Sequence, residues 1–271
     1  MTEPLPTTPS LRCDGQRALV TGASRGIGRA AALALAAAGA EVVMAARALP
    51  EMEATIAAAR AAHGPAGGPA DGPADGPGLR LSARALDVTD RAAVRALVER
   101  EGPFDFLLNN AGTNIREPFT AVQDESLDAL LDLNLRAAFT VAQAVAAGMV
   151  AAGKGGSILH LSSVNGHVGG LNRSVYTATK HAIEGLTKAM AAELGPRGIR
   201  VNALSPGFVE TPLTAGLLAD EKFRAAHLRR TPLGRMMTVE DVMGAVVFFA
   251  SPASAMISGA SLLIDGGFCS V

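Results

Sequence analysis

The chain has 271 residues, of which 49% are apolar and 18% are charged, and its 24 basic residues nearly balance its 25 acidic residues. This much apolar material can bury a sizeable core, which excludes global disorder, and the length suits one large α/β domain. A formal charge of −1 without a basic run excludes the electrostatic footprint of a protein that binds nucleic acid or an anionic membrane.

Neither the cysteines nor the N-terminus indicate secretion. Cys13 and Cys269 form no CxxC or His-linked cluster, which excludes a Cys-built zinc site and a disulfide scaffold. Residues 1–14 carry Glu3 and three prolines where a signal peptide needs a basic start and an apolar run, so we expect a disordered tail and a cytoplasmic protein. The uncharged stretch 242–264 imitates a membrane span, but Pro252, two glycines and four serines interrupt it, which predicts a buried helix, a turn and a buried strand.

From Arg17 onward, short β-branched runs alternate with Ala-rich helical segments. Strands are predicted at 18–20, 41–46, 79–86, 104–108, 157–161, 200–204 and 261–264, and helices at 29–38, 52–62, 91–101, 126–152, 176–194 and from 239. This alternation predicts an α/β fold, a doubly wound parallel sheet with helices on both faces. No linker divides the chain, so we expect a single domain over 15–271.

Two segments interrupt the alternation of predicted strands and helices. Residues 63–78 contain the sequence GPAD twice in tandem and are rich in Gly and Pro. A segment of this composition cannot bury a core, so we expect a mobile surface insertion. Residues 213–230 are expected to be partly helical and end in basic residues.

A glycine-rich turn follows the first predicted strand and opens a helix. It reads Thr21-Gly-Ala-Ser-Arg-Gly-Ile-Gly28, with the spacing GxxxGxG. Glycines let the backbone approach a pyrophosphate, and the free N–H groups at the positive helix end favour phosphates. The turn therefore predicts nucleotide binding.

Further motifs follow in a fixed order. They are Asn109-Asn110-Ala111-Gly112, Asn134, Ser163, Tyr176-Thr-Ala-Thr-Lys180 and Ser205-Pro206-Gly207. With the glycine-rich turn, this series resembles the classical short-chain dehydrogenase/reductase family over 15–267. The resemblance implies a Rossmann-type fold and hydride transfer between a nicotinamide cofactor and an alcohol or ketone.

Tyr176 and Lys180 also make chemical sense together. Spaced i and i+4 on a helix, they share a face. A phenol with a pKa of about 10 is a poor base at neutral pH, and a nearby ammonium and an oxidised nicotinamide favour the phenolate. Lowering that pKa by about three units needs roughly 4 kcal/mol, which two close cations can supply.

The resemblance implies a role for each catalytic residue. Tyr176 acts as general acid/base, and Ser163 holds the reacting oxygen. Lys180 binds the ribose hydroxyls of the cofactor and lowers the tyrosine pKa, and Asn134 anchors a water that links Lys180 to solvent. Ser162 is the rival of Ser163, but its spacing to Tyr176 is one residue too long.

The cofactor is expected to be NADP(H), with NAD(H) possible. An acidic residue at the end of the second strand would indicate NAD, but this position reads Ala45-Ala46-Arg47. Arg47 and Arg25 suit a 2′-phosphate instead; the alternative is that both are solvated. Asp87 resembles an adenine contact, although it can also cap the next helix. The predicted cofactor-binding residues are Gly22, Ser24, Arg25, Gly26, Ile27, Gly28, Arg47, Asp87, Val88, Asn110, Ala111, Gly112, Tyr176, Lys180, Pro206, Gly207, Val209 and Thr211.

The substrate pocket is expected between the loop 164–175 and a roof formed by 208–230. Their polar side chains suit a hydroxyl-rich or anionic substrate such as a sugar or aldonate. The predicted substrate-binding residues are Ser163, Asn165, His167, Tyr176, Arg116 and Arg173, with His167 having the best case because it lies four residues past Ser163. His160, inside a strand, is expected to be a satisfied core histidine, and no metal site is expected.

The sequence is consistent with three hypotheses about the function. The first is alcohol–ketone, or hemiacetal–lactone, chemistry on a small polar substrate. The second is the same chemistry on a 3-oxoacyl thioester, against which residues 137–153 offer no basic residue to an acidic carrier protein. The third is a nucleotide-sensing protein without turnover. The apolar helix 137–152 and the closing Asp265-Gly266-Gly267-Phe268 resemble inter-subunit elements of the family, which implies a homotetramer.

Overall fold

Seven strands form one parallel sheet in the computed structural model, which describes residues 5, 7–63 and 78–271. Their order is β3-β2-β1-β4-β5-β6-β7. Their bounds are β1 (Arg17–Thr21), β2 (Glu41–Ala46), β3 (Arg80–Ala85), β4 (Phe106–Asn109), β5 (Gly156–Leu161), β6 (Ile199–Pro206) and β7 (Ser261–Ile264). The predicted doubly wound parallel sheet is thereby confirmed.

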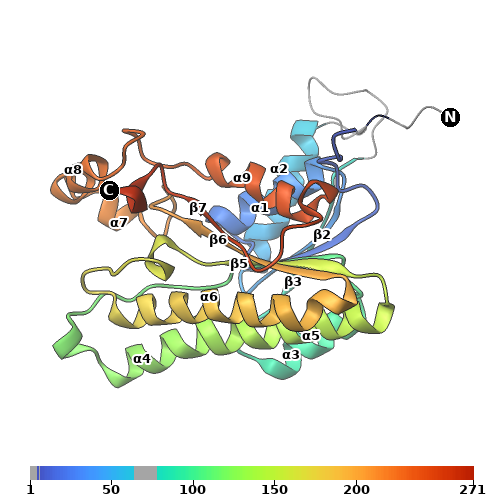
Figure 1. Cartoon of the computed structure of the whole chain (residues 1–271), viewed down its shortest axis with the longest axis horizontal. Helices are drawn as coiled ribbons and strands as arrows, with labels where there is room; N and C mark the ends of the chain where they lie inside the picture. The colour runs from blue at the N-terminus through green and yellow to red at the C-terminus, as the bar shows by residue number, and fades with distance from the viewer. Residues whose placement is uncertain (1–4, 6, 64–77) are drawn as a thin grey trace.

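Helices cover both faces of this sheet (Figure 1). One layer consists of α1 (Gly26–Ala37), α2 (Leu49–His63) and α9 (Glu240–Ala250), and the other of α3 (Arg91–Glu101), α5 (Ala138–Ala152) and α6 (Ser174–Leu194). The short helices α7 (Ala215–Leu218) and α8 (Glu221–Arg229) lie together at one end, near the C-terminus. The chain winds outward from β1 in both directions, so ligands are expected beyond the carboxyl ends of β1 and β4.

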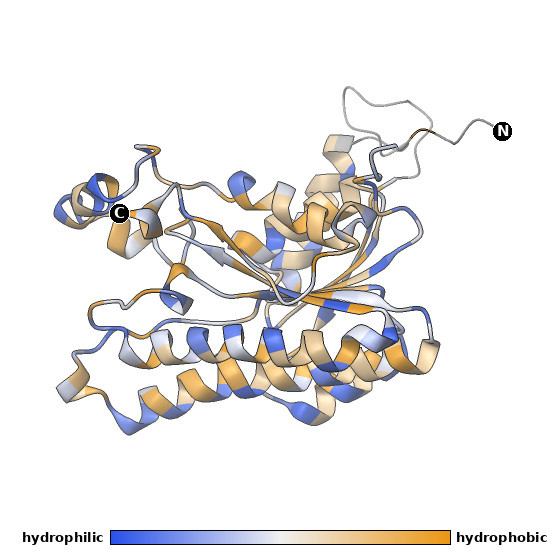
Figure 2. Cartoon of the chain, in the orientation of Figure 1, coloured by the Kyte–Doolittle hydropathy of each residue, from blue (hydrophilic) through white to orange (hydrophobic). Residues whose placement is uncertain are grey.

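The alternation of side chains along each strand divides the core into two clusters. In β1, Ala18 and Val20 pack toward α1 and α9, whereas Leu19 packs toward α3 and α5. Because both faces are covered, the central strands β1, β2 and β4 are mostly apolar, whereas the edge strand β3 alternates with Arg80, Ser82 and Arg84 (Figure 2).

The long helix predicted at 126–152 is interrupted. The structure has α4 (Asp124–Leu131), then one π-helical stretch (Asp132–Ala137), then α5. π-Helical turns are rare and occur frequently at functional sites. Here the turn contains Asn134, whose side chain is 2% exposed and points away from solvent.

Two further segments differ from the sequence-based expectations, and a third lies mostly outside the described residues. Cys13, assigned to the disordered tail, is buried in the core, and its amide donates to the Ala38 carbonyl at 2.8 Å, so the ordered fold begins before Gly15. The buried strand expected at 261–264 is a partly exposed edge strand, with Leu262 and Leu263 each 39% exposed. The predicted insertion 63–78 lies, except for its two end residues, outside the described residues.

The helix predicted at 126–152 was not considered above as a possible membrane span. Among the described residues, Asp124–Ala152 is long and apolar enough to cross a membrane by length and composition alone. Core helices have the same properties, and α5 places Val141, Val145 and Met149 in the core beneath the sheet.

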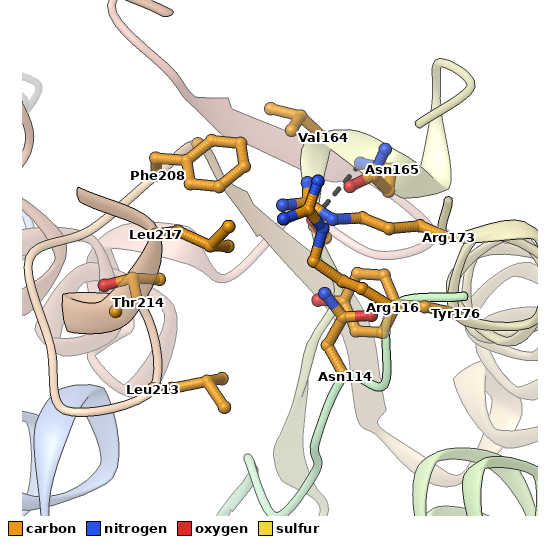
Figure 3. A pocket seen from close by; sticks show the side chains of 13 residues that line it. Asn114, Arg116, Val164, Asn165, Arg173, Tyr176, Phe208, Leu213, Thr214 and Leu217 are labelled. Carbon is orange, nitrogen blue, oxygen red and sulfur yellow. Dashed lines mark hydrogen bonds between the residues drawn. The ribbon is translucent and has the colours of Figure 1, made fainter. Parts of the chain in front are cut away.

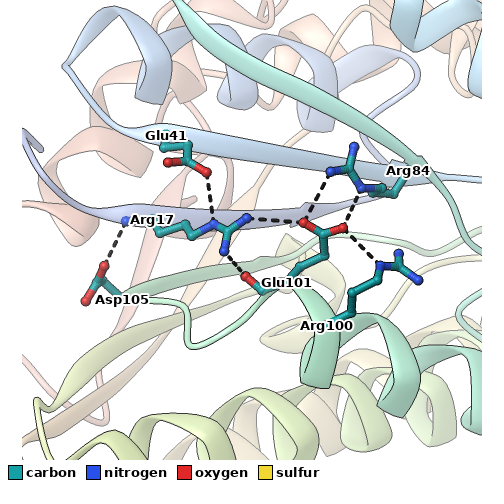
Figure 4. A network of polar contacts seen from close by, with 6 residues as sticks. All are labelled: Arg17, Glu41, Arg84, Arg100, Glu101 and Asp105. Carbon is teal, nitrogen blue, oxygen red and sulfur yellow. Dashed lines mark hydrogen bonds and ion pairs between the residues drawn. The ribbon is translucent and has the colours of Figure 1, made fainter.

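A network of charges ties the end of α3 to β1 and β3 (Figure 4). Its centre is Glu101, which is 7% exposed and accepts hydrogen bonds from Arg17, Arg84 and Arg100. The Arg84 Nε lies 2.6 Å from the carboxylate, and this hydrogen bond lowers the pKa of Glu101. The network fixes the helix against the sheet and contributes nothing to the pocket described next.

Candidate active site

The glycine-rich turn has the shape of a phosphate cradle. Gly22 and Gly26 adopt φ values of +65° and +55°, which side chains rarely tolerate. A Cβ at Gly22 would lie 2.8 Å from the side-chain Nδ2 of Asn110, and one at Gly28 would collide with the Gly22 carbonyl. Without side chains at these glycines, the backbone N–H groups at the N-terminus of α1 stay accessible. Such N–H groups are the donors that bind a pyrophosphate.

Asn110 and Thr21 hold this turn against the end of β4. The Asn110 Nδ2 donates to the Thr21 carbonyl at 2.8 Å, and the Thr21 Oγ1 accepts from the Asn110 amide at 3.0 Å and the Ala111 amide at 3.2 Å. From the sequence, Asn110 and Ala111 were assigned to the cofactor, whereas Thr21, the fully buried last residue of β1, was quoted as the start of the glycine-rich motif but given no role. Its only signal was a polar residue at the end of an apolar strand.

The segment after β6 closes the other side of the cradle. Thr211 lies opposite the turn, because a Cβ at Gly26 would contact its Cγ2 at 3.4 Å. Val209 is buried and pairs with Met237. The other residue predicted nearby in this segment, Gly207, is held by a hydrogen bond from its amide to the Ile264 carbonyl at 2.8 Å.

The groups predicted to hold the adenosine end lie at the carboxyl ends of β1, β2 and β3. Arg25, the residue before α1, and Arg47, the residue after β2, are both exposed and form no ion pair in the described part of the chain. Val88 is buried, while the Asp87 carboxylate accepts from the Thr89 amide at 3.0 Å. Asp87 does not cap α3; Asp90 does, through Ala92 and Ala93. The remaining predicted residues, Ser24, Ile27 and Gly112, are partly or fully exposed on the same side.

Ser163 and Tyr176 line one cavity of about 380 Å³ (Figure 3). Ser163 follows β5, and Tyr176 lies in the first turn of α6. Ser162 is 3% exposed, does not line the cavity, and its hydroxyl has no partner among the described residues. The geometry thus favours Ser163 over its rival.

The electrostatics of Tyr176 differ from the expectation. Burial raises the pKa of its phenol, while a hydrogen bond with Ser163 and the charge of Arg173 act in the opposite direction. The Lys180 Nζ lies 5.6 Å from the centre of the tyrosine ring and donates to the Leu161 carbonyl at 2.7 Å. In the chain alone, Arg173 rather than Lys180 is the cation that favours the phenolate.

Lys180 is 6% exposed, and burial lowers the pKa of its ammonium to about 8. One turn further along α6, the Glu184 carboxylate opposes this shift. Glu184 is itself buried and accepts from the hydroxyls of Ser205 at 2.9 Å and Ser261 at 3.1 Å. Glu184 was missed from the sequence, although its i+4 spacing from Lys180 was a usable signal.

His167 does not lie where the sequence predicted. Its Nε2 is 3.1 Å from the Ser205 hydroxyl, 3.0 Å from the Ser261 hydroxyl and 3.3 Å from the Glu184 carboxylate, and the residue does not line the cavity. The turn Val164–Gly166 after Ser163 points it toward β6 and β7. The prediction that His167 contacts the substrate is therefore corrected: its side chain forms a polar cluster with Ser205, Ser261 and Glu184.

The other predicted substrate residues, Asn165, Arg116 and Arg173, do line the cavity. Asn114 was missed, although it comes two residues after the Asn-Asn-Ala-Gly motif; its Oδ1 is buried without a hydrogen-bond partner among the described residues. The roof comes from the predicted segment 208–230, through Phe208, Leu213, Thr214, Gly216 and Leu217. Phe208 packs edge-on against Phe223 and His227, which stiffens this roof.

His160 is only partly satisfied in the core. It is 1% exposed, its Nδ1 lies 3.4 Å from the Asn109 amide nitrogen, and its Nε2 has no partner among the described residues. Burial, together with the charge of Lys180, lowers the pKa of the ring to about 4. His160 is therefore neutral at physiological pH.

Comparisons with known proteins agree with this geometry. Residues 22–269 match the family model described as "Enoyl-(Acyl carrier protein) reductase". The chain is 40% identical to gluconate 5-dehydrogenase of Gluconobacter oxydans over 257 residues, which cover 93% of this chain and 94% of the relative. It is 39% identical to L-xylulose reductase of Bos taurus, covering 95% and 98%. The crystal structure of a gluconate 5-dehydrogenase from Burkholderia cenocepacia in complex with NADP and tartrate aligns with a TM-score of 0.86 and 37% identity, covering 96% and 98%.

Proposed function

Because the chain belongs to the classical short-chain dehydrogenase/reductase family, an NAD(P)-dependent family that oxidises alcohols and reduces ketones, we propose that it acts with NADP(H) on a small hydroxyl-rich substrate. The substrate carries a secondary alcohol or ketone, or a hemiacetal or lactone. The observation that carries the proposal is that Ser163 and Tyr176 face one cavity into which two amide and two guanidinium groups also point, under a mostly apolar roof.

Tyr176 exchanges the proton of the substrate oxygen in this proposal, and Ser163 hydrogen-bonds the same oxygen as charge develops. Lys180 holds the ribose hydroxyls of the cofactor. Asn134 anchors a water that links Lys180 to solvent in this proposal; its Nδ2 lies 3.4 Å from the hydroxyl of Thr179, the residue before Lys180. The nicotinamide supplies the hydride chemistry when it is bound.

The turn with Gly22, Gly26 and Gly28 suits the pyrophosphate of a dinucleotide, because its backbone N–H groups lie at the N-terminus of α1, the positive end of the helix. Arg25 and Arg47, which are exposed and form no ion pair with the described residues, support NADP(H) over NAD(H). No carboxylate stands at the end of β2 to receive a free ribose hydroxyl. The NADP in the gluconate 5-dehydrogenase structure agrees with this preference.

A sugar-type substrate suits the cavity. About 380 Å³ is near the lower limit of small-molecule sites, and polar atoms come from Asn114, Asn165 and the two arginines. The relatives named for gluconate and xylulose, and the neighbour that holds tartrate, support the same class.

The second candidate is reduction of a 3-oxoacyl thioester, favoured by the acyl-carrier-protein description of the matching family. Against it, α5 presents Phe139, Gln143 and Ala147 on its exposed face and no basic residue. A nucleotide sensor without turnover stays as the third candidate, which a change at Tyr176 distinguishes.

We also propose a homotetramer. Phe139 on α5 is 49% exposed, and Leu262 and Leu263 on the edge strand β7 are each 39% exposed. Apolar side chains in two separate places suit two kinds of interface between copies of the chain. Light scattering after size-exclusion chromatography measures the mass; a monomer would contradict this proposal.

The test of the function is the absorbance of reduced nicotinamide on mixing the protein with NADP⁺ or NAD⁺ and a panel of sugars, aldonates and simple secondary alcohols. The reverse assay uses NADPH with a short 3-oxoacyl thioester. We expect turnover on sugar-type compounds with NADP⁺ preferred. Turnover on the thioester alone would replace the first candidate by the second.

A further inference from the structure

Arg173 is a buried cation that pairs with no carboxylate of the described residues. It is 7% exposed, and its Nε has no hydrogen-bond partner among the described residues. Its guanidinium carbon lies 4.7 Å from the centre of the Phe208 ring. Burial lowers the pKa of this group, and the positive charge of Arg116 acts in the same direction.

Arg116 enters the same cavity from the loop after β4. Figure 3 shows the two arginine side chains extending into the cavity toward one another, between Phe208 and Tyr176. Arg116 is exposed and makes no ion pair with the described residues; its guanidinium carbon lies 5.9 Å from the centre of the Phe223 ring, a cation–π contact.

The acidic groups nearest in sequence are engaged elsewhere. Glu210 of the roof lies 3.6 Å from the guanidinium of Arg224, and Glu117 accepts a hydrogen bond from the Ser126 hydroxyl at 3.0 Å. Neither carboxylate lines the cavity. Arg173 is therefore a buried charge, and no carboxylate of the described residues lines the cavity to neutralise it, while Arg116 adds a second, exposed cation to the same cavity. A buried charge is costly unless a group of opposite charge, here a ligand, completes its site.

The cofactor's phosphates do not account for this pair. None of the residues of the glycine-rich turn, 22–28, lines the cavity, whereas Ser163 and Tyr176 do. The missing anion thus belongs to the molecule whose oxygen meets Ser163 and Tyr176. Guanidinium groups match a carboxylate in charge and geometry, which the planar fork of arginine binds through paired hydrogen bonds.

We infer that Arg173 and Arg116 together bind a carboxylate of the substrate, so that the chain acts on polyhydroxy acids in preference to neutral sugars or polyols. The inference rests on the proposed function, because it assigns one end of the same substrate. Asn114 and Asn165, on the walls between, face the hydroxyl-bearing carbons.

The experiment compares matched pairs of an acid and an alditol of equal carbon number, such as gluconate with glucitol, galactonate with galactitol and xylonate with xylitol. Calorimetry measures binding to the complex of the protein with NADP⁺, and a steady-state assay measures turnover. We expect the acid of at least one pair to bind more tightly. Arg173→Met should reduce the ratio of acid to alditol affinity about 10- to 100-fold, the range of a lost hydrogen-bonded charge, and Arg173→Lys should restore part of it.

Arg229→Met is the matched control, because Arg229 is an exposed arginine of the same roof segment that does not line the cavity. It should leave the ratio unchanged, and all variants should retain NADP⁺ affinity and thermal stability. Equal affinity for acid and alditol in the wild-type protein, or an Arg173→Met variant with an unchanged ratio, would overturn the inference. Tight acid binding without turnover of any pair would overturn the proposed function and leave the carboxylate site standing.

Discussion

Asn134 exchanges two hydrogen bonds with the backbone of Thr113: its Nδ2 donates to the Thr113 carbonyl at 2.8 Å, and its Oδ1 accepts from the Thr113 amide at 2.9 Å. The π-helical turn between α4 and α5 presents this side chain to the loop that carries Asn114 and Arg116 into the cavity. The helix interruption and the shape of the pocket are therefore parts of one arrangement.

Replacing Asn134 by Ala leaves both Thr113 backbone groups without these partners. We expect the free energy of unfolding to fall by about 1–3 kcal/mol, the cost of unsatisfied buried polar groups, and kcat to fall as well. Urea titration and steady-state kinetics measure the two effects. Gln123→Ala, which removes an exposed amide that donates to the Ala121 carbonyl, is the control and should change neither quantity much. A fully stable and fully active Asn134→Ala protein would contradict this account of the turn.

Cofactor preference depends on Arg47 in this account. Arg47→Asp places a carboxylate where a 2′-phosphate is expected, so kcat/KM for NADP⁺ should fall about 10- to 100-fold while NAD⁺ loses little. Arg95→Asp changes an exposed arginine of α3 by the same charge and should not alter the ratio. An unchanged preference in Arg47→Asp would mean that the arginine is solvated in the complex.

Much of this site could be predicted from the sequence because its parts are local. The glycine-rich turn and the Tyr176–Lys180 spacing each lie within a few residues; the structure has positive φ values at Gly22 and Gly26 and places Tyr176 and Lys180 on one helix, α6. His167 was misplaced because the turn after Ser163 decides its direction, and that depends on Ser205 and Ser261 from distant strands. The π-helical turn leaves no signal in the apolar periodicity.

Lys180 should titrate near neutral pH. Its pKa of about 8 means that the ammonium loses its proton as pH rises through this value, so the affinity for NADP⁺ should weaken above pH 8. Glu184 holds this pKa up, and Glu184→Gln removes the charge while keeping a group that can accept from Ser205 and Ser261. We expect the midpoint of the affinity profile to move to lower pH in Glu184→Gln. A midpoint that does not move would exclude a charge effect of Glu184 on Lys180.

His160 should make the fold sensitive to acid. Its folded-state pKa of about 4 lies below the usual 6.5, so the unfolded chain binds the proton more readily. Stability is therefore complete above pH 6.5 and is lost as pH falls toward 4, by roughly 3 kcal/mol for a shift of this size. Denaturant titrations from pH 7 to 4 measure this slope. His160→Gln should show a shallower slope, whereas His181→Gln, at an exposed histidine, should keep it; equal slopes in all three proteins would refute the assignment.

In the proposed mechanism Tyr176 moves the proton of the substrate oxygen, and a Tyr176→Phe variant removes the hydroxyl that does so. The measurement is kcat for a substrate found in the panel, together with the dissociation constant of NADP⁺, for wild-type and variant proteins. We predict that kcat falls about 10²- to 10⁴-fold, the usual contribution of general acid–base catalysis, while NADP⁺ binding is nearly unchanged. Turnover by Tyr176→Phe at the wild-type rate would contradict the mechanism.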